Sequence, residues 1–249
     1  MSDDRCMIQP SDITVVILAG GRGTRLSSVV ADRPKPLAGV AGRPFIEYLF
    51  DQVLRAGIEK LVIASGYLGE HISNHFGSVY KTLKLQYSKE SLPLGTAGAL
   101  RYALPSVETR YLLVLNGDSF CEVDLTALAE CHRKKDARIT LTAVTVPDVS
   151  RYGSVCMNRD GLVTEFIEKG AQSGTGYINA GVYLLDKSVI ADLEPNIPCS
   201  LEKDVLPKYC NNGMYAFKAI GIFIDIGIPD DYARAQQIFT RRHGGIGNP

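Results

Sequence analysis

The stretch Ile17-Leu18-Ala19-Gly20-Gly21-Arg22-Gly23-Thr24-Arg25-Leu26 joins an apolar run to a loop rich in glycine and arginine. Glycines let backbone N–H groups approach an anion, and successive N–H groups form a concavity that binds phosphate. Arg25 adds a fork of donors suited to phosphate oxygens. Further along, Lys35 stands between Pro34 and Pro36. Proline restricts its own φ and favours extended backbone at the residue before it, so the two prolines stiffen the backbone of Lys35 and fix the direction of its ammonium group. The stretch therefore predicts a polyphosphate site.

Two common phosphate-binding motifs do not fit this loop. A P-loop requires G-x-x-x-x-G-K followed by Ser or Thr, and the sixth position counted from Gly20 or Gly21 is Arg25 or Leu26. The dinucleotide fingerprint G-x-G-x-x-G starts at Gly21 and fails at Leu26. An ordinary turn after a core strand is the alternative, and Arg25 with Lys35 argues against it.

Composition narrows the class of protein. The chain has 249 residues, 45% of them hydrophobic, and 27 basic against 27 acidic side chains. A balanced charge without a basic stripe does not favour nucleic acid or an acidic membrane as partner. The six cysteines form no zinc or C-x-x-C spacing, so we expect reduced thiols and a cytoplasmic protein. No signal peptide or membrane span is expected.

Apolar runs alternate with helical patterns along the first half of the chain, which indicates a parallel sheet covered by helices on both faces. Later strands follow one another, with a hairpin turn at Asn158-Arg159-Asp160-Gly161. We expect one α/β domain over residues 1–243 and a flexible tail over 244–249. Strands are expected over residues 13–18, 61–64, 83–87, 111–115, 138–146, 153–157, 162–167, 177–185 and 217–224, and helices from Pro44 to Gly57 and over 71–76, 96–104, 125–134, 188–193, 201–210 and 230–240.

Two aspartates follow apolar strands. The run 111–115 leads directly into Asn116-Gly117-Asp118, and Asp225 lies in Ile224-Asp225-Ile226-Gly227. Ligands of open α/β sheets bind beyond the carboxyl ends of strands, and Mg²⁺ prefers oxygen ligands and bridges phosphates. Turn or cap aspartates are the alternative. Two such aspartates with one phosphate loop favour a magnesium site.

Other polar residues suit a second substrate. Glu168-Lys169 offers a carboxylate for a hydroxyl and an ammonium for a phosphate, although a solvated ion pair is the simpler interpretation. Asn179 lies in an apolar strand and suits sugar hydroxyls, or is a bonded core amide. Gly95-Thr96-Ala97 opens a helix whose N–H groups are predicted to face a base or phosphate, or form an ordinary cap. His71 and His75 lack a third metal ligand.

Together these motifs resemble the sugar-1-phosphate nucleotidyltransferases, over roughly Ile13 to Tyr232. Within this family, Ser28-Val29-Val30 with Asp32 and Val40-Ala41-Gly42-Arg43-Pro44-Phe45 resemble the D-glycero-α-D-manno-heptose 1-phosphate guanylyltransferases. The chain departs from the family at Ile228, where threonine is common, and at Gly170, where proline is common. The resemblance implies a Rossmann-like three-layer sandwich with a mixed, mostly parallel central sheet.

The resemblance also implies a reaction. The phosphate of a sugar 1-phosphate attacks the α-phosphorus of an NTP, and pyrophosphate leaves, giving an NDP-sugar for capsule, lipopolysaccharide or S-layer glycan synthesis. Arg25, Lys35 and Asp118 would be catalytic, and Mg²⁺ would be held by Asp118 and Asp225. The sugar phosphate would be bound by Gly153, Glu168, Lys169 and Asn179, and the nucleotide by Leu18, Ala19, Gly20, Gly21, Gly23, Thr24, Arg25, Glu90, Gly95, Thr96 and Ala97.

The base is predicted from one residue. Glu90 lies five residues before Gly95, where family members often place a base-reading side chain. A carboxylate accepts hydrogen bonds, and guanine offers adjacent N1–H and N2–H₂ donors, so Glu90 favours GTP unless it is a surface residue beside Lys89. A mannose 1-phosphate or other hexose 1-phosphate enzyme and an inert sugar-nucleotide-binding regulatory subunit stay open. A homo-oligomer also stays open.

Overall fold

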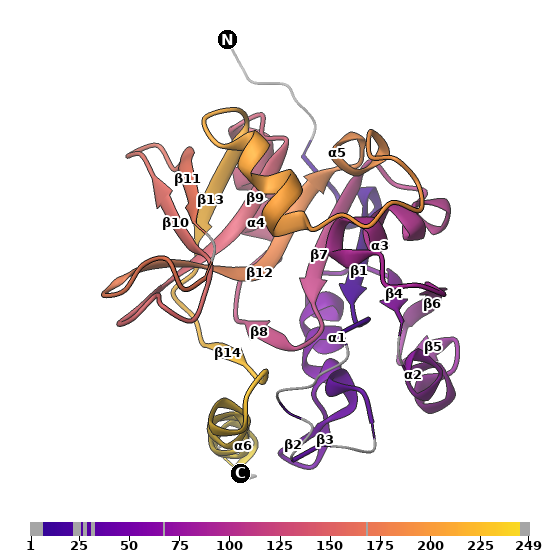
Figure 1. The fold of residues 1–249 in the computed structure, drawn as a ribbon. Coiled ribbons are helices and arrows are strands. Elements are labelled where there is room, and N and C mark those ends of the chain that lie inside the picture. Colours follow the sequence, from indigo (N-terminus) through magenta and orange to yellow (C-terminus); the bar gives the residue numbers. More distant parts are fainter. Residues whose placement is uncertain are drawn as a thin grey trace.

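Buried apolar runs form the centre of the molecule, shown in Figure 1. The computed structural model describes residues 7–21, 26, 29–30, 33–66, 68–167 and 169–244. Strand β1 (Ile13–Leu18) lies between β4 (Lys60–Ser65) and β7 (Tyr111–Asn116), and β6 (Leu83–Lys89) follows β4. All of these pairings are parallel. The sequence prediction of a parallel N-terminal half is therefore confirmed.

The second half of the chain extends the same sheet in mixed directions. Strand β12 (Gly176–Asp186) pairs antiparallel with β7, and this pairing joins the two halves. The other strands of this sheet are β5 (Val79–Tyr80), β9 (Ile139–Val146), β10 (Ser154–Met157), β11 (Val163–Ile167) and β13 (Met214–Lys218). Over the described residues the sheet has ten strands in the order β11-β10-β12-β7-β1-β4-β6-β5, with β9 beside β12 and β13 beside β9.

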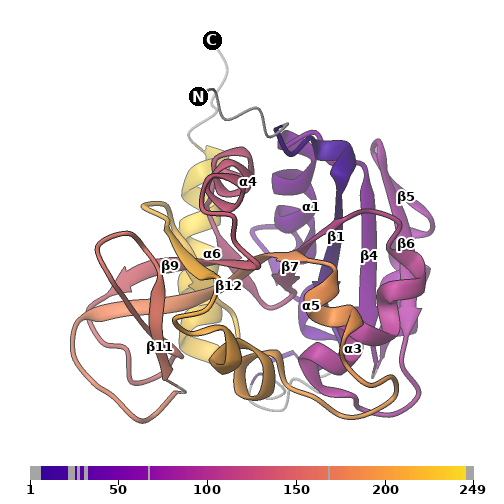
Figure 2. The same cartoon turned by 90° about the horizontal axis from the view of Figure 1, so that it is seen from above.

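Helices cover both faces of the sheet, as Figure 2 shows. On one face lie α1 (Ile46–Arg55), α4 (Leu125–Lys134) and α6 (Pro229–Gly244), whose buried side chains share one apolar cluster. On the other lie α3 (Gly95–Ala103) and α5 (Ser188–Ala191), which belong to a second cluster. The short helix α2 (Gly69–Phe76) follows β4. The three-layer expectation is confirmed.

Two small sheets position the aspartates and the chain before α1. Strand β8 (Ser119–Cys121), directly after β7, pairs antiparallel with β14 (Phe223–Asp225). Strands β2 (Gly39–Val40) and β3 (Arg43–Pro44) form the other pair. The N–H of Ile226 donates to the carbonyl of Asp118, so the chain around both aspartates is tied together.

Three local predictions were wrong. The strand expected over residues 217–224 is two strands in different sheets, β13 and β14, because the chain leaves the main sheet after Lys218. Pro44 belongs to β3, and α1 begins at Ile46. Lys35 is not extended but starts a 3₁₀ turn, Lys35–Leu37, in which the missing N–H of Pro36 costs no helical hydrogen bond.

The described residues contain no disulfide bond. The five described cysteines, residues 121, 131, 156, 199 and 210, are free thiols. Burial raises the pKa of the Cys121 thiol to about 12. In the part of the chain that the structure describes, no helix combines the length and apolarity needed to cross a bilayer.

Candidate active site

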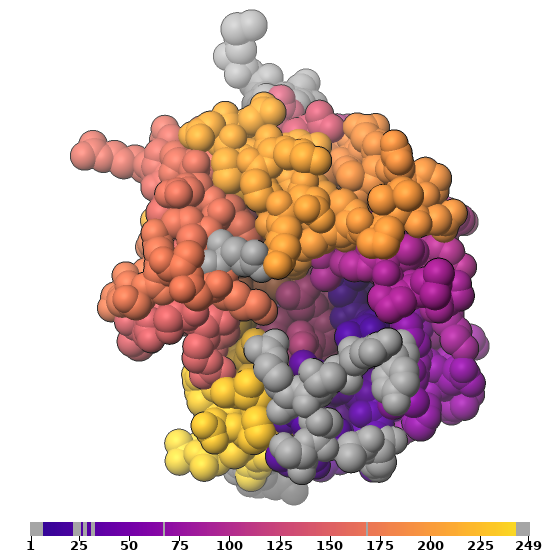
Figure 3. Space-filling model, in the orientation of Figure 1, coloured from indigo at the N-terminus to yellow at the C-terminus, as the bar shows by residue number. Residues whose placement is uncertain are grey.

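A pocket of about 730 Å³ opens where the parallel strands end. Figure 3 shows it as the hollow in the front face of the molecule, bordered above by the orange part of the chain. Ligands of open α/β sheets bind at this edge, so the strand order alone indicates the site. Its described lining residues are Leu18, Ala19, Gly20, Gly21, Lys35, Pro36, Ala64, Gly66, Leu68, Glu70, Lys89, Glu90, Ser91, Leu92, Pro93, Gly95, Thr96, Ala99, Asn116, Gly117 and Asp118.

The floor of the pocket is backbone from the ends of β1 and β7. The N–H of Gly117 donates to the Leu18 carbonyl at 2.9 Å. A Cβ on Gly117 would lie 2.7 Å from that carbonyl oxygen, closer than real Cβ atoms come. Glycine at this position therefore lets the two strand ends meet. With Gly20 and Gly21, it gives the pocket a lining of backbone without side chains.

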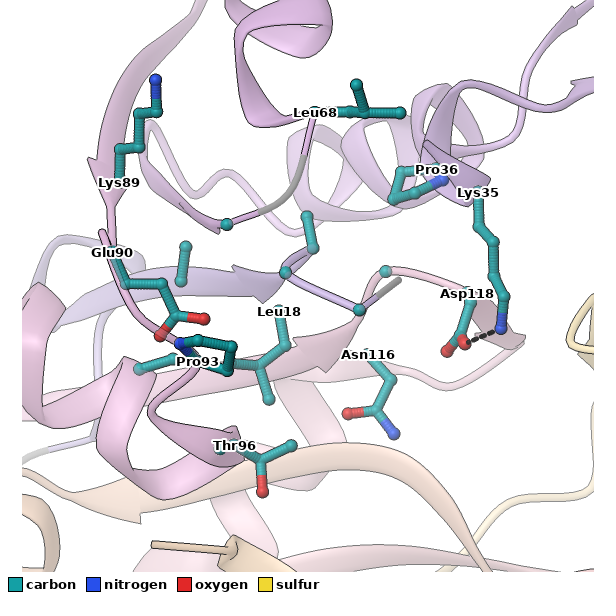
Figure 4. A pocket seen from close by; sticks show the side chains of 18 of the residues that line it. Leu18, Lys35, Pro36, Leu68, Lys89, Glu90, Pro93, Thr96, Asn116 and Asp118 are labelled. Carbon is teal, nitrogen blue, oxygen red and sulfur yellow. Dashed lines mark hydrogen bonds and ion pairs between the residues drawn. The ribbon is translucent and has the colours of Figure 1, made fainter. Parts of the chain in front are cut away.

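The charged end of the pocket is lined by Lys35 and Asp118, and Asp225, the other predicted metal ligand, is their electrostatic neighbour. Lys35 Nζ lies 3.2 Å from Asp118 Oδ2, as drawn in Figure 4, and the lysine side chain is only 13% exposed. Asp225 Oδ1 accepts the N–H of Gly227 at 2.7 Å. Burial raises the pKa of Asp225 to about 6, and the neighbouring Asp118 carboxylate acts in the same direction. The structure thus brings together three residues that are far apart in the sequence.

The donor chemistry at this end fits a divalent cation. Two carboxylates near each other repel, and a bound cation relieves that repulsion. Mg²⁺ commonly takes one or two carboxylates and completes its shell with phosphate oxygens and water. Among the described residues, no group of three or more histidine, cysteine, aspartate or glutamate side chains is close enough to hold a metal ion alone. The pair Asp118–Asp225 therefore suits a metal that arrives with a phosphate.

The opposite end of the pocket holds Glu90, as Figure 4 shows. Its carboxylate lies against Gly20 and Gly66, where added Cβ atoms would be 3.3 and 3.1 Å from Oε1. Glu90 Oε2 accepts the N–H of Leu94 at 3.3 Å. Burial raises the pKa of Glu90, and the Leu94 N–H opposes this shift. Glu90 thus offers a half-buried acceptor to the pocket, and its reading of a base stays a prediction.

The start of α3 is less open than the sequence suggested. Gly95 and Thr96 line the pocket, but Ala97 is fully buried. The N–H groups of Ala97 and Gly98 both donate to the carbonyl of Cys199, at 2.9 and 3.1 Å. These groups are satisfied by the chain itself and are not presented to a phosphate. The hydroxyl of Thr96 bonds Glu202 and is not an ordinary cap.

The predicted sugar residues that the structure describes, Gly153, Lys169 and Asn179, do not line this pocket. The N–H of Asn179 donates to the Gly153 carbonyl at 2.8 Å. Asn179 Nδ2 donates to the Tyr183 hydroxyl at 2.6 Å, and Oδ1 accepts the Gly181 N–H at 3.1 Å. Asn179 therefore keeps one N–H and one lone pair for a ligand. Lys169 lies exposed in the turn after β11.

The two side chains before Gly153 hold the loop that contains it against β14 and α6. Arg151 pairs with Asp231 at the start of α6, and this pairing raises the pKa of the arginine. The ring of Tyr152 meets Phe223 of β14 edge to face, with centroids 5.5 Å apart. These contacts hold the predicted sugar loop close to the strand that carries Asp225.

Several predicted residues lie outside the described part of the chain, namely Gly23, Thr24, Arg25 and Glu168.

The sequence analysis did not predict some of the residues that line the pocket. Asn116 directly precedes Gly117 and Asp118, so its place at a strand end was the available signal. Leu68 carries no comparable signal, because only the packing after β4 brings it to the pocket. His71 and His75 line a separate cavity of about 420 Å³ with Asn74 and Arg33.

A family comparison covers nearly the whole chain. The family described as Nucleotidyl transferase matches residues 14–242. The D-glycero-α-D-manno-heptose 1-phosphate guanylyltransferase of Aneurinibacillus thermoaerophilus is 39% identical over 89% of this chain and 96% of its own length. The protein of the same name from Campylobacter jejuni is 36% identical over 87% of this chain and 96% of its own length.

Solved structures agree with the fold. HddC from Yersinia pseudotuberculosis superimposes with a TM-score of 0.81 and 38% identity, covering 91% of this chain and 99% of that chain. The same protein complexed with GMP-PN gives a TM-score of 0.80. A glucose-1-phosphate thymidylyltransferase structure from Bacillus anthracis, described as putative, has a TM-score of 0.81 at 21% identity and so bears on the fold alone.

Proposed function

Since this chain belongs to the nucleotidyl transferase family, we propose that it transfers GMP from GTP to D-glycero-α-D-manno-heptose 1-phosphate, forming a GDP-sugar and pyrophosphate. The observation that carries this proposal is one pocket with an acceptor at its base end and a lysine–carboxylate cluster at its charged end. Relatives of 39% and 36% identity bear this enzyme name, and a 38% identical structure was solved with GMP-PN.

The reaction is an in-line exchange at phosphorus. A phosphate oxygen of the sugar 1-phosphate bonds to the α-phosphorus, the bond to the α–β bridging oxygen breaks, and pyrophosphate leaves with that electron pair. Such chemistry needs positioning and charge neutralisation more than covalent participation by the protein. Gly20, Gly21 and Gly117 supply a backbone wall for the phosphates. Lys35 supplies a positive charge that the Asp118 carboxylate holds in place.

A magnesium ion held by Asp118 and Asp225 would neutralise charge on the phosphates. Asp225 is held in turn by the Gly227 N–H, so one of its oxygens is fixed before any ligand binds. Arg25, outside the described residues, is proposed to bind the β- and γ-phosphates. Lys169, Asn179 and Gly153, with Glu168 outside the described residues, are proposed to bind the sugar phosphate.

Glu90 is proposed to select guanine. Its carboxylate is rich in acceptors and already takes one backbone N–H, which leaves acceptor capacity toward the pocket. Uracil and thymine would place a carbonyl oxygen against it, and two acceptors facing each other lose a hydrogen bond. We place the reaction in the cytoplasm, where GTP is available, with the GDP-sugar serving surface polysaccharide synthesis.

Turnover with a matrix of substrates tests the proposal. Pyrophosphate release is measured with GTP, ATP, UTP, CTP and dTTP against heptose 1-phosphate, mannose 1-phosphate and glucose 1-phosphate. GTP with the heptose 1-phosphate should give the highest kcat/KM. Mannose 1-phosphate as the best substrate would replace the sugar assignment, in line with a mannose-1-phosphate guanylyltransferase of Mycobacterium tuberculosis that is 31% identical. Binding of GDP-sugar without turnover would indicate a regulatory subunit.

A further inference from the structure

One carboxylate outside the described pocket connects the nucleotide half to the sugar half. Glu202 lies in a single π-helical turn, Leu201–Val205, in the segment after α5. Its Oε2 accepts the hydroxyl of Thr96, which lines the nucleotide pocket, at 2.7 Å. Its Oε1 accepts the hydroxyl of Tyr183 in β12 at 3.4 Å. π-helical turns occur frequently at functional sites.

The hydrogen bonds around Glu202 all point one way. Asn179 Nδ2 donates to the Tyr183 hydroxyl, and Tyr183 donates to Glu202. On the other side Leu201 N–H donates to the Thr96 hydroxyl at 2.7 Å, so Thr96 has its proton free to donate to Glu202. Because an ionised carboxylate only accepts, it gives this chain of donors a fixed direction.

The direction of these hydrogen bonds determines how the side-chain amide of Asn179 is oriented. With Nδ2 directed to Tyr183, the Asn179 Oδ1 accepts the Gly181 N–H, and the amide cannot turn over without losing both bonds. Tyr183 is fully buried, and burial raises the pKa of its phenol well above the ordinary value, so the hydroxyl stays protonated and donates. Glu202 thus acts on Asn179 through Tyr183.

The same strand is also held against the pocket by packing. Gly181 has a φ of +73°, and a Cβ there would lie 2.6 Å from Asn116 Nδ2. The register between β12 and β9 is interrupted between Asn179 and Tyr183, and the ladder with β7 begins only at Val182. Side-chain hydrogen bonds therefore add to the constraint on this stretch, and the Tyr183–Glu202 contact is one of them.

We propose that Glu202 is a positioning residue that orients Asn179 through Tyr183 and ties the sugar strand to Thr96 at the nucleotide pocket. This inference rests on the proposed function, because it takes Asn179 as a sugar-binding residue. Glu202 does not line the pocket and meets its lining only at the Thr96 hydroxyl, which the Leu201 N–H also holds, so its loss should act chiefly on the sugar 1-phosphate. The nucleotide should bind as before.

The test compares steady-state kinetics of Glu202→Gln and Tyr183→Phe with wild type. Glutamine has the same shape but offers one acceptor oxygen and a donor, so it cannot accept from both hydroxyls. Each variant should raise KM for the sugar 1-phosphate about tenfold, with kcat and KM for GTP within about twofold of wild type. The double variant should be no worse than Glu202→Gln, because both changes break the same chain.

Asp204→Ala is the matched control. Asp204 Oδ2 accepts the Ser200 N–H in the same turn, but it contacts neither Thr96 nor Tyr183. This variant should loosen the turn and leave the sugar KM unchanged. An equal rise in sugar KM with Asp204→Ala, equal rises for both substrates in Glu202→Gln, or additive effects in the double variant would overturn the positioning role.

The sugar used is whichever 1-phosphate the wild-type enzyme turns over best, so a wrong sugar assignment does not affect the result. Absence of turnover with every sugar would contradict the proposed function. The effect of Glu202 on sugar binding is then measured by calorimetric titration of heptose 1-phosphate into protein saturated with an α,β-methylene GTP analogue. Glu202→Gln should weaken this binding about tenfold, and unchanged binding would overturn the inference.

Discussion

At the scale of single residues, the pocket places its charges at opposite ends. Lys35 and Asp118 meet at one end, and Glu90 lies at the other, as Figure 4 shows. A nucleoside triphosphate has the matching polarity, with a base at one end and phosphates at the other. The residues that meet the two ends can therefore be tested separately.

Replacing Lys35 with alanine removes the positive charge that we propose acts at the reacting phosphorus. Because this charge stabilises the transition state more than the bound substrates, kcat should fall by about 10²- to 10³-fold, with a smaller change in KM. Pyrophosphate release at saturating substrates measures this. Lys60→Ala, at an exposed lysine paired with Glu108, controls for loss of a lysine. An unchanged kcat in Lys35→Ala would exclude the assigned role.

Replacing Glu90 with glutamine should reduce the preference for GTP. Glutamine adds a donor where guanine also presents donors, so the ratio of kcat/KM for GTP over UTP should fall by about tenfold or more. The exposed Glu59→Gln variant is the control for a lost carboxylate. If the ratio is the same in wild type and Glu90→Gln, another residue reads the base.

At the scale of elements, periodicity and apolar runs located most helices and strands. Helix α4 has the predicted bounds, Leu125–Lys134, and its N-cap Asp124 accepts the N–H groups of Thr126 and Ala127. The short strand β8 and the break between β13 and β14 were missed, because two or three paired residues carry no periodic signal and pair only where a distant segment lies alongside. The π-helical turn at Leu201–Val205 was predicted simply as helix for the same reason.

The start of α3 offers a test of close backbone packing. Gly95 has a φ of +72°, and a Cβ there would lie 2.6 Å from the Cys199 carbonyl oxygen. Gly95→Ala should therefore lower the free energy of unfolding by about 2–4 kcal/mol, from backbone strain plus overlap. Urea unfolding measures the change.

Gly170→Ala is the matched control for Gly95. Gly170 also has a positive φ, +89°, but nothing lies within 4 Å of an added Cβ. This variant carries the strain alone and should lose only about 1 kcal/mol. Equal losses in the two variants would show that the Cys199 contact adds nothing.

At the scale of the whole molecule, stability should depend on pH through His132. This histidine is 2% exposed, and its Nδ1 lies 2.9 Å from Thr140 Oγ1. Burial lowers its pKa from 6.5 to about 4. The unfolded chain therefore binds a proton that the folded chain does not in this range, so stability is complete above pH 6.5 and is lost as pH falls toward 4.

Urea unfolding of His132→Gln between pH 4.5 and 7.5 measures this contribution. The variant should show a flatter dependence of stability on pH, by up to about 1.4 kcal/mol per pH unit. His75→Gln, at an exposed histidine of α2, controls for loss of an imidazole. The same slope in wild type and His132→Gln would contradict this account.

The two halves should unfold together. The antiparallel pairing of β7 with β12 continues the sheet across the boundary, and Cys199 bonds α3 from the second half. Circular dichroism and hydrogen exchange of peptides from each half should give one urea midpoint. Earlier loss of protection in β9 to β13 would show that the chain is two units and contradict the single domain expected from the sequence.

The sequence by itself determined the local features: the buried strand before the glycine loop, the alternation of strands and helices, and the aspartates that follow apolar runs. These depend on neighbours in the chain, so their signal is in the order of residues. Only the tertiary structure decided which of them meet. It brings Asp225 beside Asp118 through β14 and β8, and it pairs the Ala97 N–H with the Cys199 carbonyl. It also connects Glu202 to Asn179 through Tyr183. Several of these contacts join residues more than a hundred positions apart, and they arise from packing that no local pattern encodes.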